Sequence, residues 1–198
     1  MTQNLSDQLD QAADLANWID EQFADVSFTA DGERWLAFGC LRVAMAHFGS
    51  IVTLLRHQMA TSAAVLLRSQ IDAYVRGMWL GYAASLQEID SFCEGNSPPG
   101  TGKLIGILET NGVLDSNSLS HTFSHSYGAL SDYSHTGIRL VRKQYQENSL
   151  TCSFSTQEKL EILNRGEYWS MAAGISLAEM GEQPELAQRM LRRAFPKE

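Results

Sequence analysis

Residues 33–57 read ERWLAFGCLRVAMAHFGSIVTLLRH, and this stretch decides the fold class. Its apolar residues recur at three- and four-residue steps and cover nearly all sides of a helix. A surface helix carries one apolar stripe, whereas a helix that is apolar nearly all round lies inside a larger protein. The sequence therefore predicts a long central helix, from about Glu33 to His57, with other helices packed around it.

Helical periodicity continues on both sides of this segment. Ser85 and Ser155 are suited to cap the helices that follow them, and Pro184 fits the first turn of a last helix. Further helices are predicted over residues 6–23, 62–84 with a short continuation over 86–92, 103–110, 118–135, 155–180 and from Pro184 onward.

Together these segments predict an all-α, single-domain bundle of about five to seven helices over residues 1–198. The expected divisions are an N-terminal helix in 1–30, core helices in 32–135 and C-terminal helices in 155–198. The sequence IRLVRKQY alternates enough for a short strand. At most one short hairpin or extended arm is therefore expected near 138–154.

Composition limits the possible locations and partners. The net charge of −8 argues against general nucleic-acid coating, because phosphate neutralisation needs Lys and Arg. Three scattered cysteines suggest neither a disulfide framework nor a cysteine zinc site. The N-terminal residues lack the features of a secretory signal, and no uninterrupted apolar run approaches the roughly 18 residues of a membrane span. We therefore expect a cytoplasmic protein that does not enter a membrane.

Residues 97–104, SPPGTGKL, match the middle of the phosphate-binding pattern G-x-x-x-x-G-K-[ST] but miss both ends. Ser97 replaces the first glycine. Leu104 replaces the hydroxyl residue that would ligate magnesium, and leucine cannot bind a hard cation. The preceding residues also favour a helix instead of the strand on which such loops are mounted. We interpret this stretch as an interhelical loop.

Arg68, Asp72 and Arg76 are spaced at i, i+4 and i+8, so they lie along one face of the predicted helix over 62–84. Their neighbours Val75 and Trp79 suggest partial burial, and buried charges need partners. Two interpretations stay open. The three residues form a structural brace between helices, or they form an anion- or phosphate-facing site in which Asp72 orients both guanidinium groups.

Residues 119–137, LSHTFSHSYGALSDYSHTG, carry three of the five histidines. In one helix, His121, His125, Gly128, Asp132 and His135 share a side. Apolar residues form the opposite side: Leu119, Phe123, Tyr127, Leu130 and Tyr133. One side is therefore expected to pack while the other presents titratable groups.

A metal site is the first possibility for the histidine side. His121 and His125 can share one ion, but Asp132 lies about 10 Å further along the helix at 1.5 Å per residue. No third ligand is near in the sequence. No metal or cofactor is therefore expected.

Acid–base chemistry is the second possibility. Asp132 can orient and charge the imidazole of His135, and residues 139–143 contain a dense basic cluster. A proton shuttle beside arginines is what RNA cleavage without a metal requires. The alternative is a solvated polar side whose final histidine stabilises the helix end.

Two segments carry a family resemblance: LLRSQIDAYVRGMWL (66–80) and LSDYSHTG (130–137). They resemble bacterial helical proteins that are similar in turn to HEPN (higher eukaryotes and prokaryotes nucleotide-binding) domains. The nucleases among those domains carry R-x(4–6)-H. The one match here, Arg42 to His47, lies within the apolar helix, with Val43 where a polar residue is usual and its ends on different sides. His47 is therefore expected in or near the core.

The resemblance implies a helical protein of a bacterial defence or stress system, a homodimer and a metal-independent ribonuclease. In that hypothesis His135 is the acid and base, Asp132 orients it, and Arg68 and Arg76, aligned by Asp72, hold the phosphate. Two other hypotheses stay open. One is a non-catalytic helical protein that binds a protein partner, as an antitoxin does, or is structural. The other is a bundle that binds a small molecule or nucleotide in a cavity.

Overall fold

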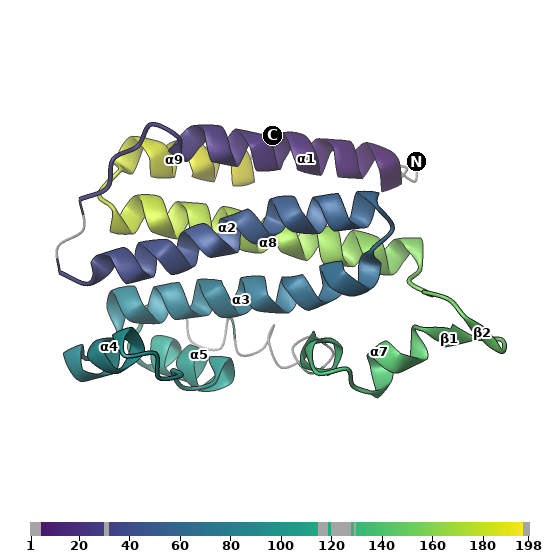
Figure 1. The fold of residues 1–198 in the computed structure, drawn as a ribbon. Helices are drawn as coiled ribbons and strands as arrows, with labels where there is room; N and C mark the ends of the chain where they lie inside the picture. The colour runs from purple at the N-terminus through teal and green to yellow at the C-terminus, as the bar shows by residue number, and fades with distance from the viewer. Residues whose placement is uncertain (1–4, 30–31, 115–118, 120–127, 129, 196–198) are drawn as a thin grey trace.

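The computed structural model describes residues 5–29, 32–114, 119, 128 and 130–195. Figure 1 shows its helices stacked in layers: α1 with α9, then α2 with α8, then α3, and finally α4 with α5. The all-α prediction is confirmed. The helices are α1 (Leu5–Phe23), α2 (Arg34–Arg56), α3 (Ala60–Tyr82), α4 (Leu86–Cys93), α5 (Thr101–Thr110), α7 (Ile138–Arg142), α8 (Thr156–Met180) and α9 (Pro184–Ala194).

Helix α2 lies at the centre of the bundle, as its sequence predicts, and packs against α1, α3 and α8. Leu41, Phe48 and Ile51 are fully buried. In the described part of the chain, α2 is also the helix whose length and hydropathy would permit a membrane span, although 44% of that window is buried in the bundle. The central helix of a water-soluble bundle has the same properties, so this is weak evidence for a span.

A buried amide ties three helices together at the centre. Gln70 of α3 is completely buried, and its Nε2 donates to the carbonyl oxygens of Ala44 in α2 at 3.0 Å and Gly166 in α8 at 2.9 Å. Helical carbonyls already accept backbone hydrogen bonds, and their second lone pair receives this amide. Gln70 therefore fixes the relative positions of α2, α3 and α8.

Helices α2 and α3 approach closely at Gly77. A Cβ atom at this position would lie 2.8 Å from Cγ of Leu41 and 3.2 Å from the carbonyl oxygen of Ala37. Contacts this short do not occur between ordinary carbon atoms, and interiors have little free volume to relieve them. The absence of a side chain at Gly77 therefore sets the distance between these two helices.

Local capping signals are confirmed where the sequence shows them. Ser85 and Ser155 each accept a hydrogen bond from the backbone of the N3 residue, and Glu88 and Glu158 complete the two capping boxes. The N-terminal half of the strand expected at IRLVRKQY is helical instead, because IRLVR forms the single-turn helix α7. The expected hairpin follows, with β1 (Tyr145–Gln146) antiparallel to β2 (Ser149–Leu150).

Candidate functional site

A cavity of about 530 Å³ lies between α3, α4 and the loop that leads into α5. Arg68, Asp72 and Arg76 of α3 form one wall, Phe92 of α4 contributes a ring, and loop residues 95–101 form the rest. We call it the arginine cavity. It joins two features that are separate in the sequence: the Arg-Asp-Arg face and the SPPGTG loop.

Asp72 is the centre of the hydrogen bonds in this cavity. Nε of Arg68 donates to both carboxylate oxygens of Asp72 at 3.0 Å. The hydroxyl of Thr101, which is 8% exposed, donates to Oδ1 at 2.5 Å. The Asp72 carboxylate therefore aligns one arginine and also fastens the first residue of α5 to α3.

Arg76 has a different environment. Its Nε is buried, and no acceptor for it lies within hydrogen-bonding distance among the residues that the structure describes. The guanidinium carbon stands 5.8 Å from the centroid of the Phe92 ring, a cation–π distance. A buried donor without an acceptor costs about 1–3 kcal/mol. Arg76 therefore lines the cavity and has an Nε–H group without a hydrogen-bond acceptor in the described structure.

The N-terminus of α5 also opens at the arginine cavity. Gly100 is its N-cap in an extended conformation and has no side chain to satisfy the first amides. In the described part of the chain, neither the N–H of Thr101 nor that of Gly102 has a hydrogen-bond acceptor. The free amides and the helix dipole make such an end favourable for a negative charge.

The charged side chains that line the cavity also favour a negatively charged ligand. Its charged side chains are two arginines and one aspartate, so the lining carries a net positive charge on an acidic protein. Burial lowers the pKa of the Arg68 guanidinium, and Asp72 opposes that change by charge and hydrogen bonding. Positive side chains and helix amides thus face one space, an arrangement that can bind an anion.

His135 and Asp132 do not line this cavity. His135 is exposed just after the helical residues 130–134. Asp132 accepts a hydrogen bond from the backbone N–H of Arg139 at 2.6 Å, so it caps the first turn of α7. A Cβ at Gly137 would lie 1.8 Å from Oδ1 of Asp132, so a larger residue there would have to displace this carboxylate. Asp132 therefore supports the start of α7. The five predicted site residues divide into two groups, one in the cavity on α3 and one near the start of α7.

The other histidine candidates are placed only in part. His121 and His125 lie outside the described residues. Arg42 forms an exposed ion pair with Asp20 at 2.9 Å. His47 is half-buried, which lowers its pKa. In the ranges that the structure describes, no group of three or more histidine, cysteine, aspartate or glutamate side chains is placed to hold a metal.

The sequence singles out the Arg-Asp-Arg face but misses its covering loop. Residues 97–100 lie in the interhelical loop between α4 and α5, whereas residues 101–104 form the first turn of α5, two residues earlier than the sequence predicts. Their resemblance to a phosphate loop suggests a preceding strand and a magnesium ion. What they contribute to the arginine cavity is instead Thr101 and the N-terminal end of α5. A free helix N-terminus behind Pro-Pro-Gly was the available signal.

The fold and the site define an all-α bundle with a cationic cavity beneath its third helix. The chain belongs to a family of unknown function, DUF6988, whose model matches residues 41–196. This match includes every residue of the arginine cavity, and it provides no link to HEPN domains. The comparisons with curated proteins and with solved structures found no match.

Proposed function

We propose that this protein binds a phosphate-bearing small molecule of about nucleotide size in the arginine cavity. The observation that carries the proposal is that Arg76 lines an open cavity and that its buried Nε lacks an acceptor among the described residues. A phosphate oxygen would supply that acceptor. Two neighbouring groups, the Arg68 guanidinium and the free amides of α5, would share the negative charge.

The size of the cavity supports a small ligand. Its volume of about 530 Å³ lies within the range of roughly 300–1,000 Å³ that is usual for small-molecule sites. Phe92 adds an aromatic surface beside the arginines. A purely structural brace would leave Arg68, Asp72 and Arg76 paired with one another and closed to solvent. In this bundle Asp72 engages Arg68 and Thr101 while the Arg76 Nε stays unused.

Calorimetric titration tests the proposal, with AMP as the phosphate monoester and adenosine as the matched neutral probe. We expect AMP to bind and adenosine to bind at least about tenfold more weakly, because a charge-assisted hydrogen bond contributes about 1.5–3 kcal/mol. Arg76→Gln should weaken AMP at least about tenfold, whereas Arg165→Gln, the same change at an exposed position of α8, should not. Equal binding of AMP and adenosine, or no binding of AMP, would contradict the proposal.

Metal-independent RNA cleavage in a defence or stress system is a separate prediction. It needs His135 to transfer a proton at a phosphate held by the arginines, with Asp132 beside it. No observation favours it over simple binding, because His135 does not line the cavity. Incubation of RNA in EDTA with the natural protein and with His135→Ala tests it. Cleavage that only the natural protein performs would support a ribonuclease, and identical results from both would exclude that role for His135.

The predicted homodimer, the RNA or protein partner and the cytoplasmic location stay predictions. Light scattering on the purified protein would give its mass in solution. A monomer at micromolar concentration would contradict the homodimer and would leave the arginine cavity unaffected, because all its described residues come from one chain.

A further inference from the structure

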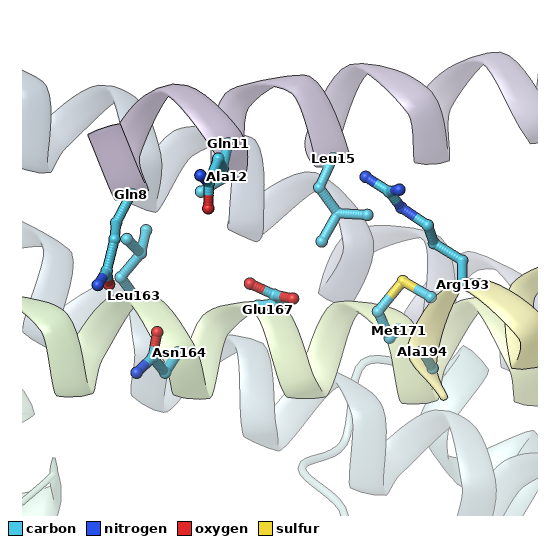
Figure 2. Close-up of a pocket in the computed structure, with 10 residues that line it drawn as sticks. All are labelled: Gln8, Gln11, Ala12, Leu15, Leu163, Asn164, Glu167, Met171, Arg193 and Ala194. Carbon is cyan, nitrogen blue, oxygen red and sulfur yellow. The ribbon is translucent and has the colours of Figure 1, made fainter. Parts of the chain in front are cut away.

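A second cavity, of about 510 Å³, lies on the opposite side of the bundle, between α1, α8 and α9. Figure 2 shows its lining, with α1 above and α8 below. Buried apolar side chains, among them Leu15 and Met171, form part of the wall. We call it the α1–α8–α9 cavity. Among the residues that the structure describes, it shares no lining residue with the arginine cavity.

Glu167 projects from α8 toward α1 into this space (Figure 2). It has no hydrogen bond or ion pair with any residue that the structure describes, although its side chain is half-buried. Burial raises the pKa of Glu167, and Arg193 opposes that change by its charge. A half-buried carboxylate without a hydrogen-bond donor destabilises the fold. Such groups are frequent at ligand-binding sites.

Arg193 lines the same cavity from the end of α9. Its guanidinium carbon stands 5.7 Å from the centroid of the Trp18 ring, so the aromatic ring supports it instead of a carboxylate. No ion pair joins Arg193 and Glu167 within 4.0 Å in the described structure, although they influence each other electrostatically. One anion and one cation thus face the same space with a gap between them.

The polar and apolar parts of the lining occupy different places. The amides of Gln8 and Asn164 lie toward one end, and Arg193 lies toward the other, with Glu167 between them (Figure 2). A neighbouring groove shares Glu167 and Met171 and continues to Ile175 and Phe195. Its wall is more apolar. A ligand with both charges and an apolar arm would complement the charged pair and the groove together.

We propose that the α1–α8–α9 cavity binds a small zwitterion, namely an α-amino acid with an apolar side chain. Its ammonium group would bind the Glu167 carboxylate, and its carboxylate would bind the Arg193 guanidinium. Its side chain would lie on the apolar wall at Met171. A simple cation is disfavoured because Arg193 faces the same space, and a simple anion is disfavoured by Glu167.

Saturation-transfer NMR with the full-length protein tests this site. The probes are leucine, methionine and phenylalanine, together with isoamylamine and isocaproate, which are leucine without its carboxylate and without its ammonium group. We expect at least one amino acid to bind. Each half-molecule should bind at least about tenfold more weakly than leucine, because it loses one charge-assisted contact.

Matched variants locate the binding. Glu167→Gln and Arg193→Gln should each weaken amino-acid binding at least about tenfold, whereas Glu161→Gln and Arg192→Gln, exposed positions on the same two helices, should leave it unchanged. Thermal melting checks that each variant is folded. Glu167→Gln is expected to fold because it removes a half-buried charge. Failure of all three amino acids to bind, isoamylamine binding as well as leucine, or full binding by Glu167→Gln would overturn the proposal.

Discussion

The hydroxyl of Thr101 donates to the Asp72 carboxylate across 2.5 Å, and this bond joins the start of α5 to the arginine face of α3. Asp72 also holds Arg68 through both of its oxygens. One carboxylate therefore sets the position of a guanidinium group and of the helix end that faces the same cavity. The geometry of the proposed anion site depends on this shared acceptor.

Thr101→Val should reduce both stability and phosphate binding. The change keeps the shape of the side chain and removes one hydrogen bond. We expect a loss of about 1 kcal/mol in the free energy of unfolding by urea titration, and weaker AMP binding because the end of α5 is no longer fixed. Thr101→Ser, which keeps the hydroxyl, is the control. Equal AMP affinity in both variants would show that the bond does not organise the site.

Gln70→Ala should be among the most destabilising single changes. It leaves a void at the centre of the bundle and removes the amide that bridges Ala44 and Gly166. We expect a loss of about 3 kcal/mol in the free energy of unfolding. Gln157→Ala, at an exposed position of α8, should change it by less than about 0.5 kcal/mol. Similar losses in the two variants would contradict the bridging role of Gln70.

Replacing glycine by alanine should lower the stability of the protein at one helical position and raise it at another. At Gly77 the added methyl group would collide with Leu41 and the backbone of Ala37, and overpacking costs about 1–3 kcal/mol. At Gly106, an exposed position of α5, an added Cβ would meet no side chain and no other segment of the described structure within 4 Å, so alanine should stabilise by roughly 0.5–1 kcal/mol through helix propensity. Chemical denaturation measures both. A stabilised Gly77→Ala would show that α2 and α3 are not closely packed.

The ion pair between Lys143 and Glu158 should make stability depend on acid pH. Burial alone would raise the pKa of Glu158, but hydrogen bonds from Lys143 and Ser155 outweigh burial and lower it. A carboxyl group with a lowered pKa in the folded state stabilises the protein above its unfolded pKa. That contribution is lost as the pH falls through the folded value, within about pH 5 to 3.

Urea unfolding between those pH values should therefore show a smaller decrease in stability for Glu158→Gln than for the natural protein. Glu161→Gln, an exposed carboxylate on the same helix, is the control and should keep the full decrease. A natural protein and a Glu158→Gln variant with the same pH dependence would contradict the lowered pKa.

The sequence predicts the helices well because their apolar periodicity and capping residues are local signals. The central position of α2 follows from a helix that is apolar nearly all round, and the capping boxes at Ser85 and Ser155 mark two helix starts. Residues 138–142 mislead because a single helical turn is too short to show a period. Its start is fixed by Asp132, a contact across a turn that spacing alone does not reveal.

The sequence predicts only the part of the candidate site that lies on α3. The spacing of Arg68, Asp72 and Arg76 places them on one face, and the structure brings them into one cavity. Thr101 and the free end of α5 are missed because their role depends on how α5 packs against α3, which is a tertiary contact. The predicted contact of His135 with these residues also required a tertiary arrangement, and His135 does not line the arginine cavity.

In the proposed complex, the buried Nε–H of Arg76 donates to a phosphate oxygen. The arginine Nε–H NMR spectrum tests it most directly, with the Arg76 signal assigned by its loss in Arg76→Gln. We expect AMP to shift this signal and adenosine at the same concentration to leave it unchanged. An Arg76 signal that stays unchanged when AMP is saturating would contradict it.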